Sequence, residues 1–419
     1  MPGKHCGRML YSHPPMAAIT YIFIILVFAT LCYFNNDSEH LTNSAIAFGI
    51  VMALTGLVHY LMLRHRRTAI EYLGGIIDTI THYDSWTEVQ LYTVNVPDGK
   101  DSNGHTTYRT ETRVRYIHHP DEWWFRTSVG TQHEISQATY NIIAATWNTP
   151  MYNFSITGSA ISGGERYGDE YYFNDVIRRE GGNCNPLYNQ ALTRYMFTIT
   201  EPHTYENKVQ NSNSIFRFEK ITDDEAQELG LHPYPTINNF DQSPILGKSI
   251  DIFTEQLIRA FNAFYGQVCQ IRLYVHLFDA SQGIETAEKQ QAYWKGGNKN
   301  EFSVCLGLDG NTVKWCYTFS WMDEPTLGVK TEGYFRENSD LDLKSYLYWL
   351  IDNINYWKRK EFKDFDYITV NLTTTQSILL ILITIVVNVL LMYYVLIPDI
   401  KKDSSQEMIE NEYYYENIY

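Results

Sequence analysis

The chain has 419 residues, enough for two compact lobes together with membrane-spanning segments. Its formal net charge of −15 argues against nucleic acid as the main ligand, because phosphate binding requires a basic surface. Strong hydrophobicity is confined to three stretches, which argues against a transporter with most of its residues in lipid.

Those stretches predict three transmembrane helices, over residues 17–34, 44–63 and 377–397. The basic N-terminal segment 1–16 and the first apolar stretch resemble a signal peptide. However, no small-x-small cleavage site follows, and a second span begins shortly afterwards. We therefore expect an uncleaved helical hairpin. Asn388 in the third span predicts contact between helices in the bilayer, including self-association.

Basic residues beside the spans predict the orientation, because cationic flanks stay in the cytoplasm. Basic clusters follow the second span at 64–67 and precede the third at 358–363, whereas loop 35–43 has no Lys or Arg. We expect the N-terminus and the large domain in the cytoplasm, at the plasma or inner membrane. The acidic, tyrosine-rich tail 398–419 then lies on the opposite side, although Lys401 and Lys402 run against that assignment.

The first part of the domain is predicted to be α+β. An apolar stripe predicts a juxtamembrane helix over 68–82, and residues 85–200 are predicted to form an α+β lobe. Two β-prone runs, 85–96 and 106–117, predict a hairpin with a long loop. The other expected strands are 122–129, 152–157 and 195–200. The expected helices are 136–147, with Ser136 as its N-cap, and 174–180.

The second part is predicted to be a separate lobe. Residues 201–247 are polar, contain four prolines and predict a joint, with a capping box at Thr222 opening a short helix. Residues 251–360 have the order α-β-α-β-β-α, which predicts a mixed sheet with packed helices. The expected helices are 251–265, 285–294 and 341–360, and the expected strands are 269–277, 302–308 and 312–321.

Cys305 and Cys316 flank the predicted turn between the last two strands. If the turn residues are Gly310 and Asn311, the two sulfurs lie opposite each other. If the turn residues are Asp309 and Gly310, the strand register shifts and the two sulfurs do not lie opposite each other. We expect reduced thiols, because the predicted compartment is the cytoplasm.

Few residue patterns suggest chemistry. The run His118–Glu122 is the best metal-like cluster, but adjacent histidines on a strand point to opposite faces. His133 and Glu134 form a similar polar pair. The glycine-rich segment 158–168 lacks the Gly-Lys-Ser/Thr of a phosphate-binding loop, and we expect a flexible surface loop. Acidic residues at strand and helix ends offer weak candidates for a divalent metal, with no other cofactor predicted: Asp309, Asp323, Asp340 and Asp342.

Residues 251–321 resemble the TPM domain, a membrane-associated α/β family. The resemblance lies in the helix 254–265, the strand 271–279, the helix 283–294 and the stretch 296–306. The chain departs from the family at Asn300-Glu301, where the family has Asn-Gly, and it has no Gly-Tyr-Gly after the hairpin. The resemblance implies metal-dependent phosphatase activity or a role as an assembly factor, and it transfers no catalytic residue.

The sequence thus predicts a multi-pass membrane protein whose large domain is a protein-interaction or assembly module. Its expected partners are the lipid bilayer and other proteins, not nucleic acid. The alternative is a TPM-like metal-dependent phosphohydrolase. That alternative requires Asp309, Asp323, Asp340 and Asp342 to converge in one pocket.

Overall fold

The computed structural model describes residues 16–34, 38–100, 102–183, 185, 188–211, 218–236, 242–360 and 367–390. Residues 1–15 of the predicted segment 1–16, residues 391–397 of the third predicted span and the tail 398–419 lie outside the described residues. The chain divides into two compact units, which we describe separately. Unit 1 comprises Met1–Ala69, Thr204–Arg217 and Glu361–Tyr419, and unit 2 comprises Ile70–His203 and Phe218–Lys360.

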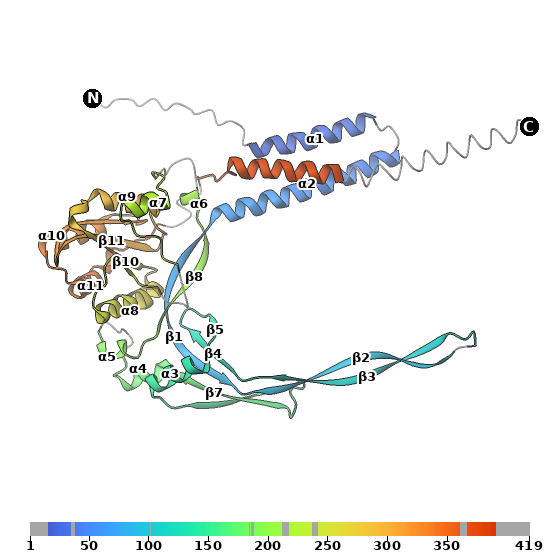
Figure 1. Ribbon diagram of the computed structural model, residues 1–419, viewed down its shortest axis with the longest axis horizontal. Helices are drawn as coiled ribbons and strands as arrows, with labels where there is room; N and C mark the ends of the chain where they lie inside the picture. Colours follow the sequence, from blue (N-terminus) through green and yellow to red (C-terminus); the bar gives the residue numbers. More distant parts are fainter. Residues whose placement is uncertain are drawn as a thin grey trace, which may run out of the picture. The chain divides into compact units, whose positions relative to one another are not determined.

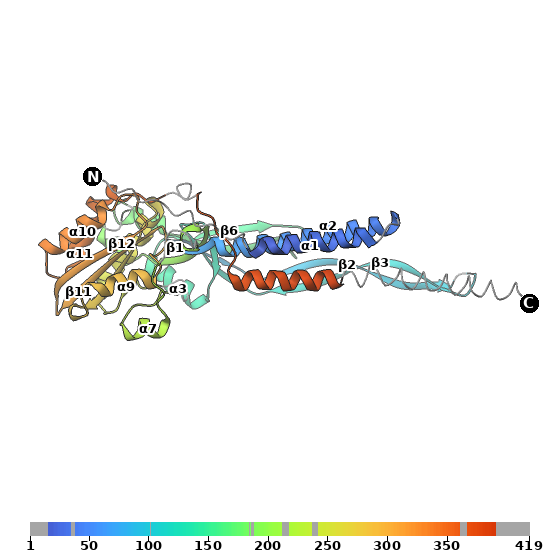
Figure 2. The ribbon, with the colours of Figure 1, turned by 90° about the horizontal axis from the view of Figure 1, so that it is seen from above.

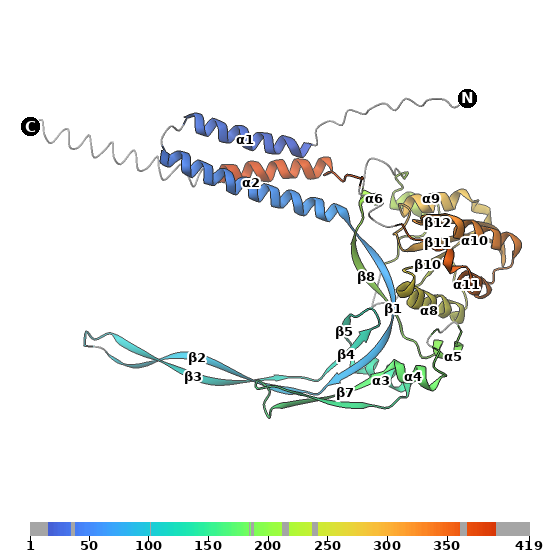
Figure 3. The ribbon, with the colours of Figure 1, turned by 180° about the vertical axis from the view of Figure 1, so that it is seen from behind.

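Unit 1 contains three apolar helices: α1 (Met16–Phe34), α2 (Ser38–Arg67) and the helix Thr374–Leu390. The segment Ala45–Arg67 of α2 is long and apolar enough to cross a membrane, and the apolar segments of the other two, Thr20–Ala29 and Thr374–Leu390, are shorter. The three helices lie side by side (Figure 3). Tyr21 is hydrogen-bonded to His59 at 2.8 Å, and Thr55 contacts Thr384 at 3.4 Å.

The predicted juxtamembrane helix over 68–82 is wrong. These residues form strand β1 (Thr68–Tyr83). The apolar stripe at helical spacing also fits a strand, because residues on both faces of β1 are buried. The pair Gly74-Gly75 disfavours a helix, and the β-branched residues around it favour a strand.

Strand β1 is the centre of a six-stranded sheet with the order β5-β4-β1-β7-β6, in which β8 also pairs with β1 (Figure 1). The other strands are β4 (Glu122–Thr127), β5 (Gln132–Glu134), β6 (Tyr152–Thr157), β7 (Glu165–Tyr172) and β8 (Thr198–Glu206). The predicted hairpin is confirmed, and so are the strands predicted over 122–129, 152–157 and 195–200, with shifted ends. The long loop expected in the hairpin is wrong, because its strands extend over Trp86–Lys100 and Thr106–His119. Residues 165–168, predicted as part of a glycine-rich loop, belong to β7. Residues 201–206, which we predicted to lie in the joint, belong to β8 instead.

Three helices accompany this sheet: α3 (Gln137–Trp147), α4 (Phe173–Arg179) and α5 (Gln190–Thr193). The predicted N-cap is confirmed, because the Ser136 side chain accepts a hydrogen bond from the Thr139 amide. Helix α3 buries Tyr140, Ile143 and Trp147 in one core with residues of β1 and β4.

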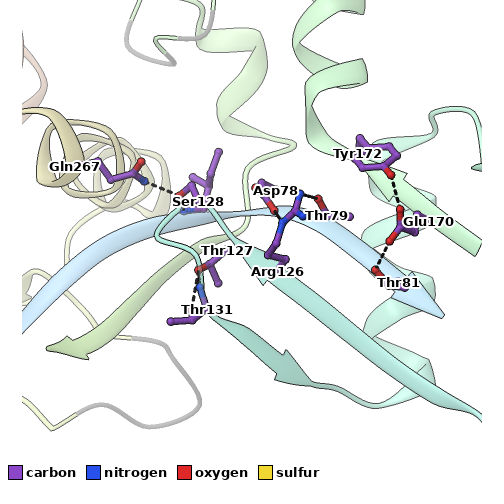
Figure 4. Close-up of polar contacts among 11 residues, drawn as sticks. Asp78, Thr79, Thr81, Arg126, Thr127, Ser128, Thr131, Glu170, Tyr172 and Gln267 are labelled. Carbon is purple, nitrogen blue, oxygen red and sulfur yellow. Dashed lines mark hydrogen bonds and ion pairs between the residues drawn. The ribbon is translucent and has the colours of Figure 1, made fainter. Parts of the chain in front are cut away.

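Side-chain hydrogen bonds join β1 to the neighbouring strand on each side (Figure 4). Arg126 of β4 donates to Asp78 and to Thr79 of β1, the latter at 2.8 Å. Thr81 of β1 donates to Glu170 of β7 at 3.0 Å. These contacts fix the register on each side of β1, so the strand holds its neighbours in place.

A second, four-stranded sheet has the order β12-β11-β10-β9. Its strands are β9 (Ile245–Leu246), β10 (Arg272–Asp279), β11 (Glu301–Asp309) and β12 (Thr312–Ser320). Strand β10 is parallel to β9 and β11, and β11 is antiparallel to β12, which confirms the predicted mixed sheet. One core packs the sheet against α8 (Ile252–Val268), α10 (Thr326–Glu337) and α11 (Leu343–Asp352), and another against α7 (Asp223–Glu228) and α9 (Glu285–Tyr293) (Figure 2).

Several predicted boundaries in this part are wrong. The helix expected over 341–360 ends at Asp352 and is followed by a 3-10 turn, Ile354–Tyr356, and helix α10 was not predicted. Helix α8 continues past Gly266 to Val268. A short helix α6 (Lys208–Asn211) and a 3-10 turn, Ala280–Gln282, complete the described helices.

Strand β1 approaches α8 very closely at Gly74. A Cβ atom at Gly74 would lie 2.3 Å from the backbone oxygen of Asn262 in α8. Real Cβ atoms do not come so close to a carbonyl oxygen, so only glycine fits. Gly266 of α8 faces the same strand, and a Cβ atom there would lie 3.5 Å from the Gly74 nitrogen, an ordinary contact distance.

This contact gives a prediction for stability. Gly74→Ala should lower the free energy of unfolding by about 1–3 kcal/mol, because β1 or α8 must move to admit the methyl group. Denaturant unfolding of the full chain in detergent measures it. The control is Gly333→Ala in α10, where nothing lies within 4 Å, and it should stabilise by roughly 0.5–1 kcal/mol. Equal effects of the two substitutions would contradict the close approach.

Candidate functional site: the β2–β3 arm and its base

Strands β2 (Trp86–Lys100) and β3 (Thr106–His119) form a two-stranded sheet of their own, which we call the arm. Figures 1 and 3 show it leaving the six-stranded sheet as a long twisted ribbon. The pairing runs from Trp86 and His119 at the root to Lys100 and Thr106 near the tip. An isolated two-stranded ribbon is marginally stable in water, so this arm needs support at its root or along a face.

The register divides the arm into two faces. Even-numbered residues of β2 pair with odd-numbered residues of β3, and paired residues share a face. The uncharged face carries Val89, Leu91, Thr93, Asn95, Pro97, Tyr108, Thr110, Thr112, Val114 and Tyr116. The charged face carries Glu88, Gln90, Tyr92, Val94, Val96, Arg109, Glu111, Arg113, Arg115 and Ile117.

Ion pairs cover part of the charged face. Arg109 contacts Glu111 at 2.7 Å and Asp98 at 3.7 Å, and Arg113 contacts Glu111 at 3.5 Å. Val94 and Val96, which pair with Glu111 and Arg109, are half-buried. The long charged side chains thus shield the apolar residues between them.

The uncharged face has no such cover. The exposed fractions are 66% for Leu91, 64% for Tyr108, 49% for Val114 and 67% for Tyr116. From Leu91 outward every residue of this face is exposed. A row of exposed aromatic and branched side chains without charges is typical of a surface that binds another molecule.

The loop between β6 and β7 supports the root of the arm. The Val89 amide donates to the Ala160 carbonyl at 2.7 Å, and the Ser162 amide donates to the Thr87 carbonyl at 2.8 Å. The glycine-rich segment 158–168, predicted to be a flexible surface loop, therefore pairs with the edge of β2 at this point. The edge beyond Val89 has no such neighbour among the described strands.

Arg166 connects the arm to the six-stranded sheet. Its guanidinium lies 4.8 Å from the ring centre of Tyr83 and 5.6 Å from that of Trp86, and it donates to the Asp84 carbonyl at 2.9 Å. Trp86 in turn stacks on His119 with ring centres 4.5 Å apart. These contacts fix the two ends of the turn that joins β1 to the arm.

Next to this turn lies a cluster around His82. Its Nδ1 atom is 3.0 Å from Asp169, and its ring stacks on Trp123 with ring centres 5.2 Å apart. The Tyr140 hydroxyl donates to the other oxygen of Asp169. Burial and this hydrogen bond raise the pKa of Tyr140 well above its usual value, so Tyr140 stays a donor at all ordinary pH values.

His82, Asp84 and Asp121 place one ligand atom each within 4.8 Å of one another, and this is the metal-like group that the described residues form. Asp121 comes from the predicted cluster 118–122. Asp84 and Asp121 are exposed, and Asp121 accepts a hydrogen bond from the Ser85 amide. Hydrogen bonding accounts for this arrangement, and we assign no ion to it.

The four aspartates predicted as metal candidates do not line one pocket in the described residues. Asp309 is exposed and lies 3.6 Å from Lys314. Asp342 caps α11 by accepting from the Ser345 amide, and it lines a pocket of about 280 Å³ together with Asp251. Asp309, Asp323 and Asp340 do not line that pocket, and no group of three potential ligands in the described residues includes any of the four.

The other predicted polar clusters have structural partners. His119 lies 3.0 Å from Glu88, and His118 points to the opposite side, next to the root of the uncharged face, as expected for adjacent strand residues. His133 lies 2.9 Å from the buried Glu201 of β8. Each of these three histidines thus lies in a strand.

Cys305 and Cys316 are free thiols. The turn uses Gly310 and Asn311, since Asp309 pairs with Thr312. A bulge between Gly307 and Leu308 nevertheless shifts the register, so Cys316 pairs with Leu306 and not with Cys305. The bulge lies beside Trp315, whose ring occupies the space that a side chain at Gly307 would need.

A histidine pair links the four-stranded sheet to the segment after α7: His276 of β10 is fully buried and His232 is half-buried. His232 and His276 stack with ring centres 5.6 Å apart and Nδ1 atoms 3.4 Å apart. Burial lowers the pKa of His232 to about 4, and burial followed by the neighbouring His232 lowers the pKa of His276 well below its usual value. Polar and apolar residues alternate along strand β10, and its polar face is buried too.

The uncharged face of the arm is the feature that sequence reasoning missed. The signal was present in β3, where Arg109, Glu111, Arg113 and Arg115 occupy odd positions while the even positions from Tyr108 to Tyr116 carry no charge. The prediction described this run only as β-prone and polar, without separating its two faces. A strand with period two makes that separation a direct consequence of the sequence.

Comparison with known proteins found no matching family model, no similar curated protein and no similar solved structure. The resemblance of residues 251–321 to the TPM family therefore stays a prediction.

The histidine pair gives a pH prediction. Between about pH 6.5 and 4 the unfolded chain protonates His232 and His276 while the folded chain keeps them neutral. The unfolded state then binds more protons, so stability falls as the pH falls through this window. For His232 the difference between 6.5 and about 4 corresponds to about 3 kcal/mol.

Denaturant unfolding at pH 7 and pH 4.5, compared between the natural chain and His232→Phe, measures this effect. The variant should lose a large part of the difference between the two pH values, because Phe has no proton to bind and can stack on Phe278, as the His232 ring does at 4.5 Å. If His232→Phe has the same difference in stability between pH 7 and pH 4.5 as the natural chain, His232 is not the group that causes the loss of stability.

Proposed function

We propose that this chain is a membrane-anchored assembly module whose arm makes the contact with its protein partner. The observation that carries the proposal is the contrast between the two faces of the arm. Ion pairs shield Val94 and Val96 of one face, whereas the other face, which has no charge, leaves Leu91, Tyr108 and Tyr116 about two-thirds exposed. Exposed side chains of this kind lower the free energy when a partner covers them.

The proposed anchor consists of three spans, α1, α2 and the helix beginning at Thr374. Helix α2 has the length and composition for a span. The contacts Tyr21–His59 and Thr55–Thr384 favour insertion of the other two beside it, because polar groups in lipid need partners. In this proposal the large domain lies in the cytoplasm, and the tail 398–419 lies on the opposite side.

The phosphohydrolase alternative requires its aspartates to converge. Asp309 contacts Lys314 and Asp342 caps a helix, so neither points to a shared metal position. The assembly function needs no such convergence, and it uses the most exposed apolar surface of the arm.

The assembly function predicts that charges on the uncharged face reduce complex size. In membranes of the cells that naturally make the chain, native electrophoresis should show a complex larger than one chain. The double variant Leu91→Glu/Tyr116→Glu should shift this complex to a smaller size, because burying two unpaired carboxylates is unfavourable.

The matched control places the same two charges on the other face. In Gln90→Glu/Tyr92→Glu the new carboxylates lie opposite Arg115 and Arg113, so the ribbon stays intact. The complex should keep its size in this control. If the natural chain and both variants migrate identically, the arm does not make the contact with the partner.

Orientation is tested at the tip of the arm. A cysteine replacing the exposed Ser102 should resist a membrane-impermeant thiol reagent on intact cells and react after permeabilisation. A cysteine beside Asp37, in the loop between the first two spans, should react on intact cells. The natural chain without an added cysteine is the control. The reverse pattern would place the domain outside and the sequons at Asn153 and Asn371 within reach of glycosylation.

A further inference from the structure

We propose that one chloride ion binds in a small pocket of unit 2, beside the buried guanidinium of Arg272. The pocket is lined by residues 198–200 of β8, by Arg259 and Asn262 of α8, and by Arg272 of β10. The arm takes no part in this site, so the proposal goes beyond the proposed function. A bound anion would connect β8 with β10 and so stabilise the junction of the two sheets.

Arg272 is a buried cation with an unused hydrogen-bond donor. Its exposed fraction is 2%. Its Nε atom donates to Tyr274 at 2.9 Å, and its Nη2 atom donates to Thr200 at 3.3 Å and to Gln242. Its Nη1 atom has no hydrogen-bond partner among the described residues. The three groups that it does bond are neutral, and a buried charge without an ionic partner is unfavourable.

Glu301 does not supply the negative charge that Arg272 needs. One of its oxygens accepts a hydrogen bond from Tyr234, and the other accepts from the Asn298 amide. The hydrogen bonds that Arg272 makes in the described part of the chain go to other residues. Burial raises the pKa of Glu301 above its usual value, although the charge of Arg272 acts in the opposite direction. The charge of Arg272 is therefore at most partly balanced.

The pocket itself is positively charged. Arg259 and Arg272 both line it, and none of the described residues that line it is acidic. Glu255 contacts Arg259 at 2.8 Å but does not line the pocket, so it balances one guanidinium and not the other. Burial and then the charge of Arg272 lower the pKa of Arg259, because the two cations repel each other. An anion beside both guanidinium groups would offset that repulsion.

The size of the pocket limits the ligand. Its volume is about 10 Å³, which is room for one particle of about the size of water. Phosphate, sulfate and carboxylate ligands have several heavy atoms and do not fit. Chloride is a single atom only slightly larger than a water molecule, and it is the anion of this size that is common in biological fluids.

The available donors suit an anion better than water. Gln242 and Asn262 use their side-chain amides on backbone carbonyls, at 3.2 Å and 3.0 Å. The Nη1 group of Arg272 remains to donate, and so does the Thr200 hydroxyl, which accepts from Nη2 and keeps its own proton. A water molecule would accept these bonds but leave the charge unbalanced, whereas chloride does both.

Thermal unfolding of the full chain in detergent at pH 7 tests the proposal. Chloride is titrated against gluconate, which is too large for the pocket, at constant ionic strength. Tryptophan fluorescence follows unit 2 alone, because all 9 Trp residues of the chain lie in it. The unfolding midpoint should rise by roughly 2–4 °C once chloride exceeds its dissociation constant several-fold.

Two matched substitutions assign the effect to the pocket. Arg272→Met removes the charge and the Nη1 donor, so its midpoint should not respond to chloride. Arg109→Met removes the same group from the exposed arm, and its midpoint should respond as in the natural chain. If Arg272→Met does not fold, Thr200→Val and Thr200→Ser replace it. Thr200→Val loses the hydroxyl donor and should respond less, whereas Thr200→Ser should keep the response.

Three results would overturn the proposal. Equal midpoints of the natural chain in chloride and in gluconate would mean that no anion site exists and that water suffices for Arg272. A full chloride response in Arg272→Met, or in Thr200→Val where Arg272→Met does not fold, would place the ion elsewhere. Loss of the response in Arg109→Met would show a general effect of charge. None of these results changes the migration expected for the arm variants, so the two proposals stand or fall separately.

Discussion

The arrangement of unit 2 depends on the close approach of β1 to α8 at Gly74. There the strand backbone comes within reach of the Asn262 carbonyl, and no side chain larger than hydrogen fits. The same strand pairs with β4, β7 and β8, and it provides the carbonyls of Ile70 and Tyr72 to the amides of Asn298 and Asn300 beside β11. One strand therefore holds the two sheets together and then leads directly into the arm.

The junction between the sheets is polar as well as close. Arg272 is almost fully buried and donates to Tyr274 at 2.9 Å and to Gln242. Glu301 accepts from Tyr234 and from the Asn298 amide, and burial raises its pKa above the usual value. Buried polar groups are costly unless they find specific partners, so this network favours a single arrangement of the two sheets over others that bury the same apolar area.

Much of the fold follows from local patterns, and the failures have physical causes. Ser136 caps its helix as predicted, because an N-cap is decided by neighbouring residues alone. The run 68–82 was misread because a strand buried on both faces carries no period-two signal. The bulge that shifts Cys305 away from Cys316 lies beside the Trp315 ring of the neighbouring strand, a contact that local patterns do not reveal. Of the candidate site, the two faces of β3 could have been predicted and the contacts of Arg166 with Tyr83 and Trp86 could not.

The central claim is that the uncharged face of the arm is covered in the working protein. Hydroxyl-radical footprinting of the natural chain tests it without any substitution. In membranes Tyr108 and Tyr116 should be protected and should become reactive when the chains are diluted in detergent, whereas Tyr92 on the charged face should react equally in both. If Tyr108 and Tyr116 react as strongly in membranes as in dilute detergent, the face is not an interface and the account is wrong.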